Sequence, residues 1–340
     1  MIILLKKNAT ASQEEELIER IVEMGLETHI SHGKERTIIG LVGNTNAISM
    51  DSILKYPMVD DVKRIAEPYK KANRQFHEED SIISVGGLPV GGDNFMVCAG
   101  PCSVEDEDLM IETAIRVKAA GANMLRGGAF KPRTSPYSFQ GLGVEGLKRL
   151  QKAKEVTGLP IVSELMSEEF LDEFVERVDL IQIGARNMQN FSLLKELGKT
   201  QTPILLKRGL SSTYEEWLMS AEYIMAGGNN NVILCERGIR TYETATRNTF
   251  DIQAVPVIQK KSHLPIVMDP SHAAGTRYIV PSMSKASVMA GANGLILEVH
   301  PQPEKAWSDG QQTLSLDEFE DLMVVVKQLL AIEGKIIPSL

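Results

Sequence analysis

The sequence lacks a long apolar run, an excess of basic residues and paired cysteines. These features would indicate a membrane protein, a nucleic-acid-binding protein and a disulfide or zinc-binding protein, respectively. No stretch approaches the roughly 20 apolar residues that a membrane span needs. The opening MIILLKK is a short apolar patch followed by lysines, the reverse of a secretory signal. We therefore expect a soluble, cytoplasmic protein that has no membrane partner.

The charge and the cysteines exclude three further kinds of protein. The formal net charge is -9, whereas a nucleic-acid surface would show a basic stripe. The three cysteines, Cys98, Cys102 and Cys235, are odd in number and lack CxxC spacing. Neither a disulfide framework nor a structural zinc knuckle is indicated. We expect no nucleic-acid partner, and any anion site must be local.

The first part of the chain predicts a small α+β domain. Residues 1–72 read strand, helix, strand, strand, helix, strand, which is the split βαβ order of a ferredoxin-like fold. The expected elements cover residues 1–7, 12–25, 27–31, 36–43, 46–56 and 62–70, with a hairpin turn at 32–35. Ser12 is the expected N-cap of the first helix. Residues 73–94 are expected to form a linker and a β-hairpin around Gly86 and Gly87.

The rest of the chain, residues 95–340, predicts an α/β barrel. Eight short apolar runs alternate with helical patterns, at residues 95–100, 122–128, 160–165, 180–185, 203–208, 231–237, 265–270 and 294–300. A doubly wound open sheet would give the same alternation. The count of eight, and polar residues at the ends of many strands rather than at one switch point, favour a closed (β/α)8 TIM barrel.

Basic residues recur at or after the ends of the predicted strands. They are Arg126, Lys131, Arg133, Arg186, Lys207 and Arg237. Guanidinium groups bind phosphate and carboxylate oxygens bidentately, and six cations would overcompensate a single phosphate. Each residue alone could equally be a structural ion-pair partner. The collective pattern favours two phosphorylated substrates, whereas Arg208 is expected to point away from them.

A second set of residues offers mixed metal ligands. Cys102, His272, Glu298 and Asp309 follow the first, seventh and eighth strands, which are neighbours in a barrel. Sulfur, nitrogen and oxygen donors together suit manganese, iron, cobalt or zinc better than magnesium. Scattered residues of these types more often have structural roles, so spacing alone leaves the metal site a hypothesis. Cys98 and Cys235 lie inside apolar runs and are interpreted as packed core thiols.

Several motifs carry a family resemblance. They are AGPCSVE at 99–105, LRGGAFKPRTSPYSFQG at 125–141, IGARNMQN, LLKRG, CERGIRTYETATRNTFD, DPSHAAG and EVHPQPEKAWSDGQQ. Over essentially the whole chain the sequence resembles 3-deoxy-D-arabino-heptulosonate 7-phosphate (DAHP) synthase, in the short-chain branch with an N-terminal ferredoxin-like (ACT-like) regulatory domain. This resemblance implies a transferase that condenses phosphoenolpyruvate with erythrose 4-phosphate, the first step of the shikimate pathway. It also implies a homotetramer.

The resemblance assigns roles residue by residue. It implies one divalent transition metal ion (manganese, iron, cobalt, zinc or similar), held by Cys102, His272, Glu298 and Asp309. The phosphoenolpyruvate pocket falls on Arg126, Lys131, Arg186, Lys207 and Arg237. Arg133, Thr134 and Ser135 match the segment that holds erythrose 4-phosphate. Lys131 is the candidate proton donor, and Glu164 or His272 is expected to assist the addition of water.

Regulation and two alternative functions complete the expectations. The resemblance implies a tyrosine or phenylalanine effector, with His29 and Ser31 as candidate contacts, although a polar hairpin explains either residue equally well. The first alternative is a related 3-deoxy-D-manno-octulosonate 8-phosphate (KDO8P) synthase. In those enzymes the corresponding segment looks like KANRSS, whereas this sequence has KPRTS at 131–135. A non-catalytic amino-acid sensor is the other alternative. A scaffold would have no need for unpaired ions at a barrel mouth.

Overall fold

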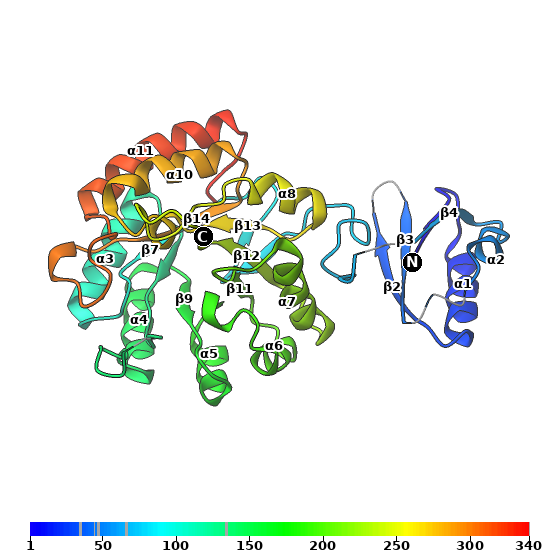
Figure 1. Cartoon of the computed structure of the whole chain (residues 1–340), viewed down its shortest axis with the longest axis horizontal. Helices are drawn as coiled ribbons and strands as arrows, with labels where there is room; N and C mark the ends of the chain where they lie inside the picture. The colour runs from blue at the N-terminus through cyan, green and yellow to red at the C-terminus, as the bar shows by residue number, and fades with distance from the viewer. Residues whose placement is uncertain (34–35, 44, 46–47, 65–66, 133–134, 340) are drawn as a thin grey trace. The chain divides into compact units, whose positions relative to one another are not determined.

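The computed structural model divides the chain into two compact units, Met1–Asp80 with Lys260–His263 and Ser81–Gln259 with Leu264–Leu340. Residues 1–33, 36–43, 45, 48–64, 67–132 and 135–339 are described. One unit contains a four-stranded sheet and the other a closed barrel (Figure 1). Within the described residues, no helix has both the length and the apolar character to cross a membrane.

The small unit has the predicted order of elements. They are β1 (Ile2–Leu5), α1 (Ala11–Glu23), β2 (Glu27–His32), β3 (Thr37–Val42), α2 (Met50–Leu54) and β4 (Val59–Lys63). The strands lie in the order β2-β3-β1-β4, and each neighbouring pair is antiparallel. Ile3 and Leu5 project from one face of β1 into a core that includes Leu17 and Ile21 of α1. The ferredoxin-like prediction is confirmed.

Two local expectations in this unit are wrong. The N-cap of α1 is Thr10, not Ser12: Thr10 Oγ1 accepts from Gln13 N at 3.3 Å, and Gln13 Oε1 accepts from Thr10 N at 3.0 Å. The last strand is Val59–Lys63, not residues 62–70. A shift in its pairing opposite Leu4 and Leu5 interrupts the apolar–polar alternation, which is why the sequence pattern did not reveal the strand.

The large unit is a closed barrel of eight parallel strands. They are β7 (Met96–Gly100), β8 (Met124–Arg126), β9 (Ile161–Glu164), β10 (Leu180–Ile183), β11 (Ile204–Lys207), β12 (Val232–Glu236), β13 (Ile266–Met268) and β14 (Gly294–Glu298). The ring closes because β7 pairs with both β14 and β8. The predicted TIM barrel is therefore confirmed, and an open sheet is excluded.

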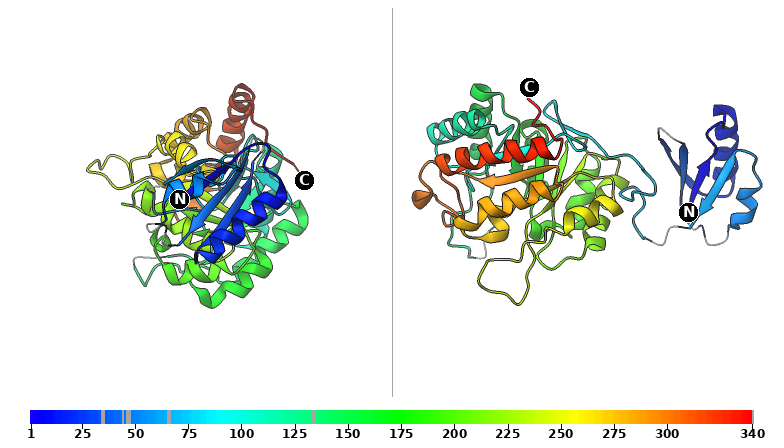
Figure 2. Two further views of the ribbon diagram at one scale, coloured as in Figure 1. Left: turned by 90° about the vertical axis from the view of Figure 1, so that its right-hand side faces the viewer. Right: turned by 90° about the horizontal axis from the view of Figure 1, so that it is seen from above.

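Helices follow the strands of the barrel, and most of them lie on its outside (Figure 1). They are α3 (Glu107–Ala120), α4 (Val144–Thr157), α5 (Leu171–Arg177), α6 (Phe191–Gly198), α7 (Tyr214–Ala226), α8 (Ala254–Lys261), α9 (Pro270–Ala274), α10 (Val280–Met289) and α11 (Leu316–Ile332). Four 3-10 turns, η2 (Glu168–Phe170), η3 (Ala185–Asn187), η4 (Arg277–Ile279) and η5 (Pro303–Lys305), lie in the connections. Figure 2 shows α10 and α11 side by side on the barrel surface.

A hairpin closes the amino-terminal end of the barrel interior. β5 (Ile83–Val85) and β6 (Leu88–Val90) are joined by Gly86 and Gly87, whose φ angles of +55° and +91° suit a two-residue hairpin turn. The apolar side chains of this hairpin form one buried cluster with inward-facing barrel residues. These include Leu205 of β11, and the next inward position on that strand is Lys207. The interior thus changes from apolar to charged towards the carboxyl ends of the strands.

Truncating Leu205 to alanine tests this layering. Leu205 is fully buried, and a leucine-to-alanine change in such a core costs about 2–5 kcal/mol of unfolding free energy. Val324→Ala on α11, where the side chain is 60% exposed, is the control and should change stability by less than about 0.5 kcal/mol. Calorimetric melting would measure both variants. Equal melting temperatures would show that Leu205 does not pack in the barrel interior.

Candidate active site

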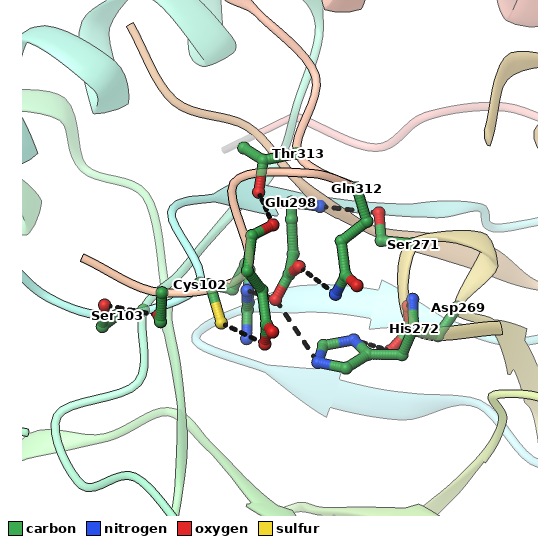
Figure 3. Close-up of polar contacts among 12 residues, drawn as sticks. Cys102, Ser103, Asp269, Ser271, His272, Glu298, Gln312 and Thr313 are labelled. Carbon is green, nitrogen blue, oxygen red and sulfur yellow. Dashed lines mark hydrogen bonds and ion pairs between the residues drawn. The ribbon is translucent and has the colours of Figure 1, made fainter. Parts of the chain in front are cut away.

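Four potential metal donors meet at the carboxyl end of the barrel. One ligand atom from each of Cys102, His272, Glu298 and Asp309 lies within 4.8 Å of the others. Cys102 Sγ donates to Asp309 Oδ2 at 3.2 Å, and His272 Nε2 is 3.3 Å from Glu298 Oε1. Figure 3 shows the side chains of Cys102, His272 and Glu298 converging on one point. The structure therefore brings together all four residues that the sequence singled out as ligands.

Asp269 orients the histidine of this cluster. It is the N-cap of α9, where its Oδ1 accepts from His272 N at 2.9 Å. Its Oδ2 lies 2.8 Å from His272 Nδ1, so Nε2 is the ring nitrogen that faces Glu298. Metal-binding histidines usually have a carboxylate next to the ring nitrogen that does not bind the metal, as Asp269 is next to Nδ1 here.

The electrostatics of the cluster also suit a cation. Burial alone would raise the pKa of the Glu298 carboxyl, but His272, Arg126 and Lys131 outweigh it and lower this pKa to about 2. Burial, reinforced by Glu298, raises the pKa of the Cys102 thiol to about 12. A bound divalent cation would stabilise the thiolate instead. Sulfur, nitrogen and two carboxylates are a donor set that fits a transition metal.

A cavity of about 340 Å³ opens beside the donor cluster. It is lined by predicted site residues together with a few others: Lys131, Pro132, Ser135, Ser138, Glu164, Gly184, Ala185, Arg186, Lys207, Arg237, Arg247, His272 and Asp309. Lys131 Nζ donates to Cys102 O and to Cys102 Sγ, both at 2.9 Å, which places it between the cavity and the cluster. Arg133 and Thr134 lie outside the described residues.

The cations at the mouth fall into a paired group and an unpaired one. Arg126 Nη1 is 2.8 Å from Glu298 Oε1, and Lys207 Nζ is 2.6 Å from Asp269 Oδ2. Arg237, only 6% exposed, has a buried Nη1 without a hydrogen-bond partner among the described residues. Burial lowers the pKa of its guanidinium. Because a buried donor without an acceptor is costly, Nη1 of Arg237 indicates an anion site beside it.

Arg208, next to Lys207, lies on the other side of the barrel wall. Its Nη1 is 3.0 Å from Glu236 Oε2 and 2.8 Å from Asp251 Oδ2, and its guanidinium lies 4.5 Å from the centre of the Tyr214 ring. These partners make it a structural residue of the wall, and it does not line the cavity.

Sequence reasoning missed two arginines. Arg240 and Arg247 line a smaller cavity of about 110 Å³ together with Arg186 and Arg237. Both lie in the long connection after β12, where no strand end marks them. The family motif CERGIRTYETATRNTFD contains both arginines, but nothing in the sequence indicated that they lie near the site.

The two regulatory candidates lie in the small unit. His29 and Ser31 are two residues apart on β2, so their side chains lie on the same face of the sheet; they pair with Gly40 and Ile38 of β3. Ile38 belongs to a cluster with Ile2 and Leu4, separate from the core beneath the helices. His29 and Ser31 therefore occupy the face of the sheet that points away from α1.

The fold and the site together define a class. A closed barrel with a metal-type donor cluster and a cavity lined by basic side chains at the carboxyl ends of its strands is the arrangement of a barrel enzyme for anionic substrates.

Comparison with known proteins narrows this class. The chain matches the DAHP synthetase I family over residues 65–332 and the DAHP synthase ferredoxin-like domain over residues 1–67. Phospho-2-dehydro-3-deoxyheptonate aldolase of Thermotoga maritima is 48% identical over 329 residues, which cover 97% of each chain. 2-Dehydro-3-deoxyphosphooctonate aldolase of Geobacter sulfurreducens is 32% identical over 74% of this chain and 97% of its own.

Solved structures agree with this result. The crystal structure of the Thermotoga maritima DAHP synthase has a TM-score of 0.79 at 47% identity and covers 99% of both chains. A truncated form of the same enzyme has a TM-score of 0.74 and covers 78% of this chain and 98% of that one. The chain belongs to the DAHP synthase family, and its general reaction is the condensation of phosphoenolpyruvate with erythrose 4-phosphate.

Replacing Arg237 with leucine should raise the melting temperature of the ligand-free protein. The change removes a buried cation that has no hydrogen-bond partner at Nη1, worth about 1–3 kcal/mol. We expect phosphoenolpyruvate to raise the melting temperature of the unchanged protein, and the Arg237 change should remove that rise. Differential scanning fluorimetry with and without phosphoenolpyruvate measures both effects.

Arg208→Leu is the matched control. It leaves Glu236 and Asp251 without their guanidinium partner and should lower the melting temperature, because breaking a buried pair costs about 3–5 kcal/mol. Shifts of the same sign in the two variants would contradict the division into paired and unpaired arginines.

Proposed function

We propose that the 340 Å³ cavity is the catalytic centre of a metal-dependent DAHP synthase and binds phosphoenolpyruvate next to erythrose 4-phosphate. The observation that carries this proposal is the convergence of Cys102, His272, Glu298 and Asp309 beside an arginine-lined cavity. The metal is a divalent transition ion, since one thiol, one imidazole and two carboxylates are the available donors. When bound, it supplies Lewis-acid polarisation of the aldehyde oxygen of erythrose 4-phosphate.

The basic residues of the cavity hold the anionic groups of phosphoenolpyruvate. Arg186 and Arg237 line both cavities, and Lys207 lies on the wall of the larger one. Arg126 is not among the residues that line the cavity; its Nη1 is 2.8 Å from Glu298 Oε1, so it would act on the site through this ion pair. We propose that Ser135, with Arg133 and Thr134, holds the phosphate of erythrose 4-phosphate. This arrangement orients C3 of phosphoenolpyruvate towards the aldehyde carbon and removes the entropic cost of bringing two substrates together.

The reaction then makes one carbon–carbon bond and breaks one carbon–oxygen bond. C3 of phosphoenolpyruvate attacks the aldehyde carbon, and the aldehyde oxygen takes a proton. Water adds at the cationic C2 and loses one proton. Cleavage of the bond between C2 and the phosphate oxygen then releases phosphate, which takes up the proton of the C2 hydroxyl as the ketone forms. The product is a seven-carbon 2-keto acid phosphate. The positive side chains of the cavity stabilise the anionic oxygens throughout.

Lys131 is the proposed donor of the proton to the aldehyde oxygen. Its Nζ is 2.9 Å from Cys102 Sγ and lines the cavity, so it would lie between the donor cluster and a bound substrate. Of the two candidates for the water step, Glu164 is the better one. It lines the cavity, and its Oε2 accepts from Gln182 at 3.0 Å, whereas both ring nitrogens of His272 have neighbours in the cluster.

The KDO8P synthase alternative predicts a different acceptor. The relative with that name from Geobacter sulfurreducens is 32% identical to this chain, and the match leaves about a quarter of this chain uncovered. The proposal favours erythrose 4-phosphate because the N-terminal unit matches a domain of DAHP synthases. A sensor without catalysis has no specific observation in its favour.

A direct assay tests the assignment. Consumption of phosphoenolpyruvate should require erythrose 4-phosphate, should be much slower with arabinose 5-phosphate, and should stop with EDTA and resume with Mn²⁺. Cys102→Ala should lower turnover more than about 100-fold, because even the outer partners of metal ligands are worth about 10- to 100-fold. Cys98→Ala, in the apolar barrel interior, should keep turnover. Turnover by Cys102→Ala in metal-depleted buffer would refute the ligand assignment.

We also propose that residues 1–72 form a regulatory domain for the barrel at 95–340, with residues 73–94 between them. A tyrosine or phenylalanine effector would bind on the face of β2 that carries His29 and Ser31. Inhibition requires that the effector bind two states of the enzyme with different affinities. The homotetramer implied by the family resemblance stays a prediction for light scattering to test.

Tyrosine and phenylalanine should lower the turnover of the unchanged enzyme. His29→Ala and Ser31→Ala should each raise the concentration needed for half inhibition by about tenfold, as expected for the loss of one good polar contact. Thr28→Ala is the control, since Thr28 points to the opposite face of the same strand. Unchanged rates at saturating concentrations of both amino acids would remove the regulatory proposal.

A further inference from the structure

Asp309 differs from the other three donors in its backbone. Cys102, His272 and Glu298 lie within a few residues of a barrel strand, but Asp309 lies in the connection between η5 and α11. Among the described residues other than glycine, only Asp309 has a positive φ, at 53°. A left-handed conformation at a non-glycine residue persists only when its surroundings hold it there. Something outside the local backbone must therefore hold Asp309 beside the other donors.

Two sets of side-chain hydrogen bonds hold the segment, one on each side of Asp309. On the upstream side, Ser308 Oγ and Ser103 Oγ are 2.7 Å apart, and Trp307 N donates to Glu105 Oε1 at 2.8 Å. On the downstream side, Gln312 Nε2 donates to Glu298 Oε2 at 2.6 Å. The contacts of Ser103 and Gln312 are drawn in Figure 3. The upstream hydrogen bonds thus connect the Asp309 segment to the segment that carries Cys102, and the downstream hydrogen bond connects it to Glu298.

Besides the hydrogen bond from Cys102 Sγ to Asp309 Oδ2 itself, the Ser103–Ser308 contact joins the segments that carry these two donors. Each serine immediately adjoins a donor in sequence, so one hydrogen bond joins the backbones that carry Cys102 and Asp309. Ser103 is fully buried and Ser308 is 6% exposed. Ser103 is itself held to the barrel, because it forms a β-bridge with Gly128 and Val104 N donates to Gly128 O at 3.0 Å. The contact therefore fixes a loop against a rigid part of the barrel.

We propose that Ser103 and Ser308 are positioning residues that set the separation of Cys102 and Asp309 and thereby the affinity of the metal site. This inference rests on the proposed metal-dependent function. Neither serine is one of the four donors: each adjoins a donor in sequence and acts through it. Residues that orient metal ligands typically contribute about 10- to 100-fold to metal affinity.

The test compares Ser103→Ala, Ser308→Ala and the double variant in the full-length chain. Mn²⁺ affinity is measured by competition with a chromogenic chelator, with no substrate present. Each single change should weaken binding about tenfold. Because both changes remove the same hydrogen bond, the double variant should bind no more weakly than the weaker single variant. Ser282→Ala, an exposed serine on α10, is the control and should bind as the unchanged chain does.

The possible results separate this inference from the proposed function. If the unchanged chain binds Mn²⁺ and turns over substrate while both single variants bind equally well, the positioning role is overturned and the proposed function stands. Losses that multiply in the double variant would also overturn it, since the serines would then act independently. Failure of the unchanged chain to bind any divalent ion would overturn both. Circular dichroism of each variant distinguishes weaker binding from loss of the fold.

Discussion

The balance of buried charge at the carboxyl end of the barrel is the constraint on which the rest of the site depends. Side chains alternate along each strand, so the inward positions that follow the apolar layers, at the carboxyl ends of the strands, carry the charged groups of the site. Charges in that environment are tolerated only when they are paired or meet a ligand. Lys207 with Asp269 and Arg126 with Glu298 are paired, whereas Nη1 of Arg237 has no partner among the described residues.

The paired groups also connect the two halves of the site. Glu298 takes part in the donor cluster and pairs with Arg126, while Asp269 orients His272 and pairs with Lys207. The positive charges of Arg126 and Lys207 therefore lie next to the donor cluster, because Arg126 pairs with a donor and Lys207 pairs with the residue that orients His272. A single layer of ion pairs can in this way preorganise the metal site and the adjoining anion site.

Prediction from the sequence worked where local patterns are strong and failed where tertiary contacts override them. The eight apolar runs were sufficient for the barrel, and the family motifs located the four donors. The first helix begins after Thr10 rather than Ser12 because the capping box joins Thr10 to Gln13. The last strand of the small unit was misplaced because a shift in pairing disturbs its alternation.

The sequence by itself determined the order of elements, the eight strand positions and the residue types available for chemistry. Those follow from side-chain periodicity and composition, which are local properties. Only the tertiary structure decided which cations are paired, that Arg240 and Arg247 approach the site, and how Ser308 contacts Ser103. These depend on distances between segments up to about two hundred residues apart, and such distances exist only once the barrel has closed.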